Sequence, residues 1–80
     1  MLTLDKKPLV LKALGISKST LYNRINSGLM TPPVSIGPRS VAWPSNEIES
    51  IVHAQIADKT ENEIYLLVKV LIKQRKQEVA

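Results

Sequence analysis

The stretch from Leu14 to Tyr22 decides the fold, and it reads LGISKSTLY. Gly15 supplies the positive φ with which helices commonly end, and Ser17 is a residue type that caps the start of the next helix. After that cap, Leu21 and Ile25 lie one helical turn apart and indicate the buried side of the second helix. Two short helices joined by a tight turn that contains a glycine are typical of a helix-turn-helix.

The two helices on either side of this turn have recognisable ends. The first is expected to run to about Leu14 with Asp5 as its cap. Pro8 is tolerated because the first turn of a helix offers no intrahelical partner for its missing N–H. The second helix is expected from Lys18 to about Ser27, and Gly28 closes it.

A small β-hairpin is expected after the second helix. Thr31-Pro32-Pro33 excludes helix and passes the chain in extended form to residues 34–36. Gly37-Pro38-Arg39-Ser40 then predicts a turn, and residues 41–43 a second short strand. A two-stranded hairpin alone is marginal in water, so Trp43 is expected to anchor it in the core rather than to stack on a base.

Two further helices are expected in the C-terminal part. Ser45 is the expected cap of the third, with Glu47 and Glu49 on its surface near the positive end of its dipole. Thr60 and Glu63 match a capping box, so a fourth helix is expected to start near Glu61 and to run to about residue 77. The expected inner stripe of the third helix is Ile48, Ile51, Val52, Gln55 and Ile56.

Together these elements predict a mainly α fold with a small β-hairpin, a winged helix-turn-helix followed by an extra C-terminal helix. The polar step at residues 58–60 is the only candidate boundary, which divides the chain into a winged helix-turn-helix domain (1–58) and a C-terminal amphipathic helix (59–80). We expect 1–58 to be the functional module and 59–80 an appendage.

The apolar stripe of that last helix is broader than one helical face needs, since Tyr65, Leu66 and Val70 widen it. It either closes a thin core or meets a second copy or another protein. We expect self-association through it. The distal cations, Lys69, Lys73, Arg75 and Lys76, suit the negative helix end and could also meet phosphate. The stripe consists of Ile64, Leu67, Val68, Leu71 and Ile72.

Composition narrows the class of protein. The chain has 80 residues, a size typical of one domain, and a formal net charge of +4, the balance expected where the partner is a polyanion. The absence of cysteine excludes disulfides, thiolate zinc sites and a cysteine nucleophile. We expect a cytoplasmic protein that neither is exported nor spans or binds a membrane, because no signal-like or long apolar stretch is present.

Catalytic and metal motifs are missing. His53 has no second histidine beside it and is read as a surface residue. The acidic residues fall at expected caps and helix surfaces rather than in a catalytic pair, and the sequence contains no nucleophile triad order or phosphate-binding glycine loop. The chain is therefore not expected to be an enzyme or to need a cofactor or metal.

The second helix carries a polar face suited to nucleic acid. Ser19, Tyr22, Asn23 and Asn26 recur at i, i+3, i+4 and i+7, opposite the apolar side, where they can donate and accept hydrogen bonds at base edges in a major groove. A solvated helix side is the plain alternative. Asn23 is the candidate for adenine, and Lys18 the candidate for guanine or phosphate.

Arg39 stands at the expected hairpin tip, where a long cation can lie along phosphates or enter a minor groove. Pro38 stiffens this turn and so limits the entropy lost on contact. An ordinary solvated turn arginine is the alternative. The full set of expected DNA-binding residues is Ser17, Lys18, Ser19, Thr20, Tyr22, Asn23, Arg24, Asn26, Arg39 and Ser40.

The order of turn, wing and tryptophan resembles the AlpA family of phage-type regulators, itself similar to excisionases and to MerR-type DNA-binding domains. The resemblance rests on residues 14–22, Gly28, Pro32, residues 37–39, Trp43 and residues 47–48, and it covers roughly 5–58. It implies a winged helix-turn-helix that binds double-stranded DNA and either regulates an integrase gene or assists an integrase as an excision factor for a prophage or genomic island. Arg24 departs from the aliphatic residue frequent in the family, and could meet a phosphate or pair with an acidic neighbour.

Two classes of function remain open at this point. The first is a sequence-specific DNA-binding regulator or recombination directionality factor. The second is a protein-interaction module that inhibits or recruits a partner through the same fold, since fold does not settle function.

Overall fold

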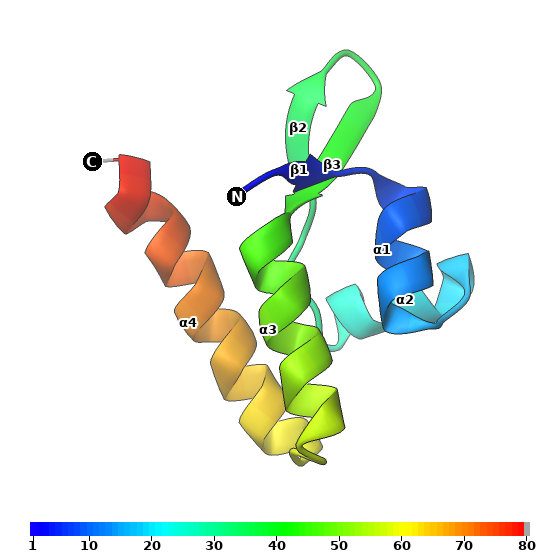
Figure 1. Ribbon diagram of the computed structural model, residues 1–80, viewed down its shortest axis with the longest axis vertical. Coiled ribbons are helices and arrows are strands. Elements are labelled where there is room, and N and C mark those ends of the chain that lie inside the picture. Colours follow the sequence, from blue (N-terminus) through cyan, green and yellow to red (C-terminus); the bar gives the residue numbers. More distant parts are fainter. Residues whose placement is uncertain (80) are drawn as a thin grey trace.

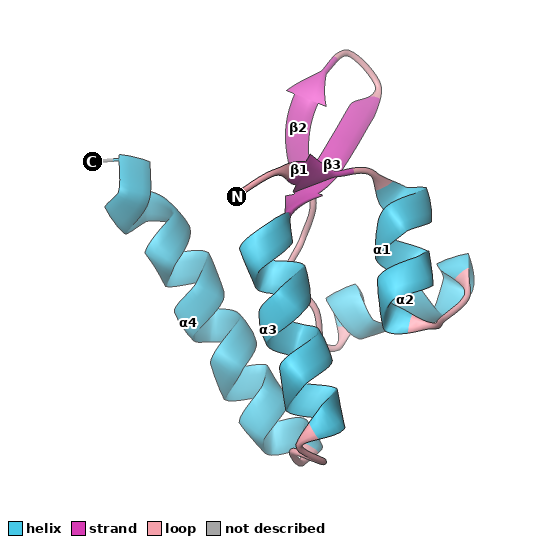
Figure 2. Ribbon diagram, in the orientation of Figure 1, coloured by secondary structure: helices cyan, strands magenta, loops and turns pink. Residues whose placement is uncertain are grey.

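A small antiparallel sheet projects from one end of a group of helices in this computed structural model, which describes residues 1–79 and the side chains of residues 1–76 (Figures 1 and 2). The expected mainly helical fold with a hairpin is confirmed. The sheet has the strand order β1-β3-β2. The elements are β1 (Leu4–Asp5), α1 (Lys7–Leu14), α2 (Lys18–Asn26), β2 (Val34–Gly37), β3 (Ser40–Pro44), α3 (Ser45–Ile56) and α4 (Glu61–Val79).

The helix-turn-helix forms as its sequence predicts. Gly15 ends α1 with φ 67°, and its N–H donates to the carbonyl of Leu11 over 2.8 Å. Ser17 caps α2, because its hydroxyl accepts a hydrogen bond from the N–H of Thr20. Leu21 then points into the core and is fully buried. These local signals therefore fix where α1 ends and where α2 begins.

The N-terminal end of α1 corrects one prediction. Asp5 does not cap the helix; it belongs to β1, whose residues Leu4 and Asp5 pair with Pro44 and Trp43 of β3. The N-cap position is Lys6, which makes no side-chain capping bond. A strand of two residues carries no periodicity of its own and exists only because β3 supplies its hydrogen-bonding partner.

The wing is the β2–β3 hairpin, with Val34 opposite Ala42 and a register irregularity between Ser35 and Gly37. Figure 1 shows it extending from the upper end of the molecule. Trp43 anchors its base as expected: the ring is fully buried, and Nε1 donates to the carbonyl of Thr31 over 2.9 Å. One large side chain thus anchors the hairpin to the core.

The start and end of α3 also differ from expectation. Ser45 is the first helical residue rather than the cap, and its hydroxyl accepts from the backbone N–H of Thr3 over 2.8 Å. Ile56, expected on the inner stripe, is 75% exposed at the last helical position, where the chain turns toward α4. The capping box that starts α4 is confirmed, because the N–H groups of Thr60 and Glu63 each donate to the other's side chain over 3.1 and 3.2 Å.

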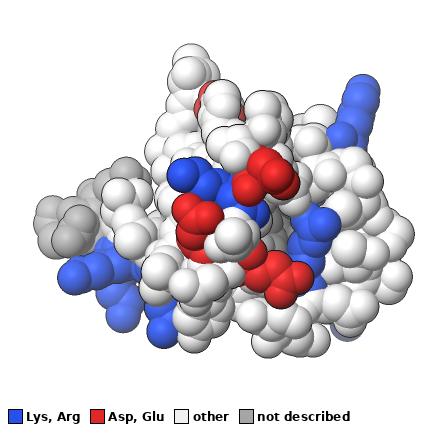
Figure 3. All heavy atoms as spheres, turned by 90° about the horizontal axis from the view of Figure 1, so that it is seen from below, with Lys and Arg blue, Asp and Glu red and all other residues white. Residues whose placement is uncertain are grey.

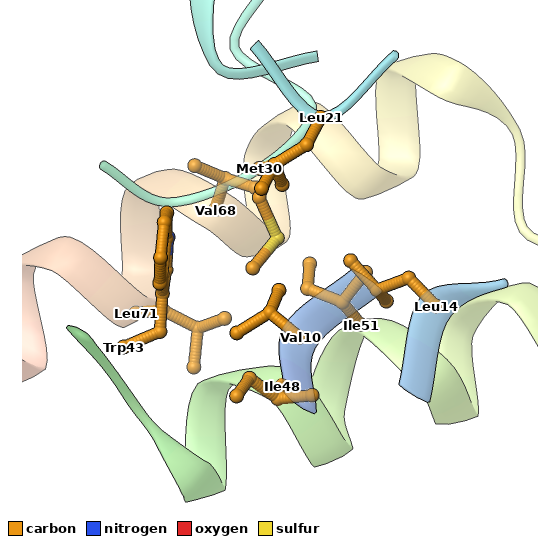
Figure 4. Packing of buried hydrophobic residues seen from close by; sticks show 9 residues of the cluster. All are labelled: Val10, Leu14, Leu21, Met30, Trp43, Ile48, Ile51, Val68 and Leu71. Carbon is orange, nitrogen blue, oxygen red and sulfur yellow. The ribbon is translucent and has the colours of Figure 1, made fainter. Parts of the chain in front are cut away.

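The core lies where α1, α2, β3 and α3 meet α4, and Figure 4 shows these side chains converging from all five elements. Val68 and Leu71 of α4 are buried in it, while Ile64, Leu67 and Ile72 pack against it. Burial of the predicted stripe therefore needs no second copy. The buried cluster consists of Val10, Leu14, Leu21, Met30, Trp43, Ile48, Ile51, Val68 and Leu71.

A buried ion pair joins α4 to α3 and corrects the expectation for both of its residues. Glu47 is not on the helix surface but only 1% exposed. Arg75 binds its two carboxylate oxygens through Nε and Nη2, each over 2.6 Å, and Nη2 also donates to the carbonyl of Pro32 over 2.7 Å. Arg75 is thereby committed within the chain rather than free to meet phosphate.

Candidate nucleic-acid interface

Helix α2 presents its predicted polar face to solvent. Leu21 is buried and Ile25 partly buried on the inner side, against the core. The opposite side is exposed over its whole length and offers hydroxyl, phenol and amide groups. Its residues are Ser19, Tyr22, Asn23 and Asn26.

The first turn of α2 gathers three hydroxyl groups. The Ser17 hydroxyl lies 3.2 Å from that of Ser19 and 2.9 Å from that of Thr20. Ser17 and Thr20 are thus occupied mainly by the cap, whereas Lys18 and Ser19 are exposed beside it. Their N–H groups belong to the first turn, where a helix has no acceptors for them, so this end favours a negative charge.

Lys7 is a residue of this surface that the sequence analysis missed. Its ammonium group lies 4.9 Å from the centre of the Tyr22 ring. A hydrogen bond from Lys7 is the main cause that lowers the pKa of the Tyr22 phenol, and the charges of Lys7 and Lys18 act in the same direction. The contact joins the start of α1 to the outer face of α2, and no signal within either helix foretells it.

A second lysine and tyrosine pair lies beyond the C-terminal end of α2. Gly28 follows that helix with φ 79°, and a Cβ atom placed there would lie 2.6 Å from the ring of Tyr65 on α4. The ammonium group of Lys69 lies 4.7 Å from the centre of the same ring. One such pair therefore lies against the middle of α2, with its lysine from α1, and the other lies beside the glycine that follows α2, with both residues from α4.

Arg24 is set apart from the predicted reading face. It lines an open hollow of about 470 Å³ together with Asp58, Lys59 and Glu61 from the α3–α4 turn. Figure 3, which views this lower end, shows acidic and basic side chains gathered together there. Arg24 thus lines a hollow that also has acidic residues in its lining, but it forms an ion pair with none of them in the part of the chain whose side chains are described.

Arg39 and Ser40 are carried by the wing. Arg39 is exposed in the two-residue loop between β2 and β3, and its φ of 58° lies in the left-handed region. Ser40 begins β3 opposite Gly37 and is partly buried. The cation at the tip is therefore the free group of this loop.

Other kinds of site find little support in the described part of the chain. His53 is exposed on α3, and no group of three or more metal-ligating side chains is found in residues 1–76. None of the helices within residues 1–79 combines the length and apolar content that a membrane span requires.

Comparisons with known proteins address the same part of the chain. The family model described as Prophage CP4-57 regulatory protein (AlpA) matches residues 6–56, which run from the start of α1 to the end of α3. The chain is 36% identical over 52 residues to the uncharacterized protein ORF88 of Enterobacteria phage P4. That match covers 65% of this chain and 59% of the phage protein, so the chain spans less than two thirds of its relative's length. No solved structure matches the chain. With the helix-turn-helix and wing inside the matched segment, the chain belongs to the AlpA family of phage-type DNA-binding regulators.

Proposed function

We propose that this protein binds double-stranded DNA sequence-specifically, with α2 in the major groove and the wing on the adjacent backbone. The observation that carries the proposal is the exposed polar face of α2, which lies opposite the buried Leu21. Hydroxyl and amide side chains at this position of a helix-turn-helix are the groups that read base edges.

Base reading is assigned to the middle of α2. The Asn23 amide can pair with adenine through two hydrogen bonds, because its N–H donates to N7 and its carbonyl oxygen accepts from the N6 amino group. This pairing is the one that geometry favours for asparagine. Tyr22 and Asn26 flank it on the same exposed face. Lys18 and the first-turn N–H groups meet guanine or phosphate.

Backbone positioning is assigned to three cations outside that face. Lys7 lies over the ring of Tyr22, Lys69 lies over the ring of Tyr65 beyond the C-terminal end of α2, and Arg39 stands at the wing tip. Such contacts carry no sequence information, but they set orientation and supply salt-dependent affinity. A cation held over an aromatic ring loses less side-chain freedom on meeting a phosphate.

At a finer level, we infer that the protein is a recombination directionality factor, or a transcriptional regulator, of a prophage or genomic-island integrase. The support is its family, described as a prophage regulatory protein, and its relative from a phage. An integrase is then the protein partner. Footprinting on DNA that flanks the protein's own gene tests this role: protection at an attachment site indicates excision, and protection at a promoter indicates transcriptional control.

Fluorescence anisotropy across a salt series tests DNA binding itself. Phosphate contacts make log affinity fall linearly with log salt concentration, whereas a protein-interaction module has no such slope. Asn23→Ala is expected to reduce discrimination between cognate and random DNA by about 1–3 kcal/mol with little change on random DNA. Equal losses on both DNAs would refute the base-reading assignment.

A further inference from the structure

The outward side of α4 carries an apolar pair that the core does not use. Leu66 and Val70 lie one helical turn apart and are 53% and 50% exposed. They are distinct from Val68 and Leu71, which fill the core from the other side of the helix. Figure 1 shows α4 at the left edge of the molecule, beside α3.

The apolar surface continues into a hollow between α3 and α4. This hollow has a volume of about 350 Å³ and includes Ala54 from α3 and Leu67 from α4 in its lining. Leu66 and Val70 form part of the same lining, together with Lys59 and Glu63. The outward side of α4 is therefore a continuous apolar strip with charged groups at its margin.

The charges along this strip are ordered so that it complements itself. Glu63, Leu66, Val70 and Lys73 follow one another at spacings of three, four and three residues, which places them along one line of the helix. Leu66 and Val70 each stand two residues from Val68, and Glu63 and Lys73 each stand five residues from it. Along the helix the order is thus acid, apolar, apolar, base, and the middle of this line is at the level of Val68, which itself faces the core.

This order selects an antiparallel arrangement of two copies. A parallel pair would set Glu63 against Glu63 and Lys73 against Lys73. An antiparallel pair about a two-fold axis at the level of Val68 sets Leu66 against Val70 of the second copy, and Glu63 against Lys73 of the second copy, twice over. Both Glu63 and Lys73 are exposed.

We propose that the outward side of α4 is a homodimer interface in which two copies pack antiparallel through Leu66 and Val70, flanked by two Glu63–Lys73 ion pairs. Glu63 keeps Oε1 for the capping box, while Oε2 lies 3.6 Å from Lys59 in an exposed contact and accepts from the second copy. With so few apolar groups the dimer is weak in solution. Neighbouring half-sites on DNA strengthen it through effective concentration.

The interface leaves α2 free and gives the dimer a defined symmetry. Tyr65, which packs on Gly28 beside α2, projects about 100° around the helix from Leu66. An isologous dimer has two-fold symmetry, so its two recognition helices face a target with two inverted half-sites.

Sedimentation of the intact chain over a concentration series up to the millimolar range tests the interface without DNA. Wild-type protein is expected to show a monomer–dimer equilibrium. Lys73→Glu and Glu63→Lys are each expected to weaken dimerisation by about tenfold, because each change sets like charges opposite one another at both pairs. An equimolar mixture of the two variants is expected to restore dimerisation, since both contacts in the mixed dimer again join opposite charges.

Two controls keep the result clear. Lys12→Glu makes the same change in net charge as Lys73→Glu, but on α1, at the far side of the molecule from α4 in Figure 1, and is expected to dimerise like wild type. Val70→Ser leaves every charge and the capping box in place, so it tests the interface even if Glu63→Lys fails to fold; it is expected to be monomeric. A wild-type chain that stays monomeric, or folded variants whose mixture stays monomeric, would overturn the proposal.

Discussion

Arg75→Met tests the ion pair that joins the C-terminal part of α4 to α3. In the wild-type chain the Glu47 carboxylate is 1% exposed and receives both of its hydrogen bonds from Arg75. The methionine side chain keeps much of the volume of the arginine stem but supplies no cation. The variant therefore leaves a buried carboxylate without a partner and removes the donor to the carbonyl of Pro32.

The size of the effect follows from the environment of the pair. Removing one partner of a buried ion pair costs about 3–5 kcal/mol, and we expect about 3 kcal/mol here because the Arg75 side chain is 21% exposed. A chain of 80 residues has a total stability of about 4–12 kcal/mol. The loss corresponds to a fall in Tm of roughly 12–24 °C.

Thermal and urea denaturation followed by circular dichroism measure this loss, and a double-mutant cycle assigns it to the pair. Glu47→Leu combined with Arg75→Met replaces the pair by apolar groups, which is often neutral or stabilising. The double variant is thus expected to be more stable than Arg75→Met alone. The assigned ion pair is wrong if Arg75→Met lowers the free energy of unfolding by less than about 1 kcal/mol. It is also wrong if the losses of the single variants Arg75→Met and Glu47→Leu simply add up to the loss of the double variant.

Three further predictions concern separate parts of the chain. Lys7→Gln is expected to lower affinity for all DNA sequences and to reduce the slope of log affinity against log salt by about one, whereas Lys12→Gln, exposed on the same helix, leaves the slope unchanged. A chain that ends at Asp58 is expected to be unfolded by circular dichroism, because it lacks the α4 side chains that close the core; a folded shorter chain would contradict this. The backbone hydrogen bond from Thr60 is the main cause that lowers the pKa of the Glu63 carboxyl group. The stability that the ionised Glu63 contributes is therefore fully present above the ordinary pKa of glutamate and is lost as the pH falls through the lowered pKa. Glu63→Gln, which still completes the capping box, is expected to flatten acid denaturation curves in that range, and an unchanged curve would argue against it.

The sequence by itself determined the elements whose signals are local. Gly15, Ser17 and the Thr60 capping box act within one helical turn, so their effect can be read from neighbouring residues. Prolines before the wing and the single tryptophan likewise predicted an anchored hairpin. The exposed face of α2 followed from helical periodicity once Leu21 was placed inside.

Only the tertiary structure decided the features that depend on residues far apart in the chain. Strand β1 exists through its pairing with β3, and Glu47 is buried because a cation 28 residues later reaches it. The lysine beside Tyr22 comes from α1. An apolar stripe shows that a helix must bury one side, but not whether its own core or another molecule covers that side. For α4 the answer depended on the direction of the turn after α3, which brings Val68 and Leu71 into the core and leaves Leu66 and Val70 outside.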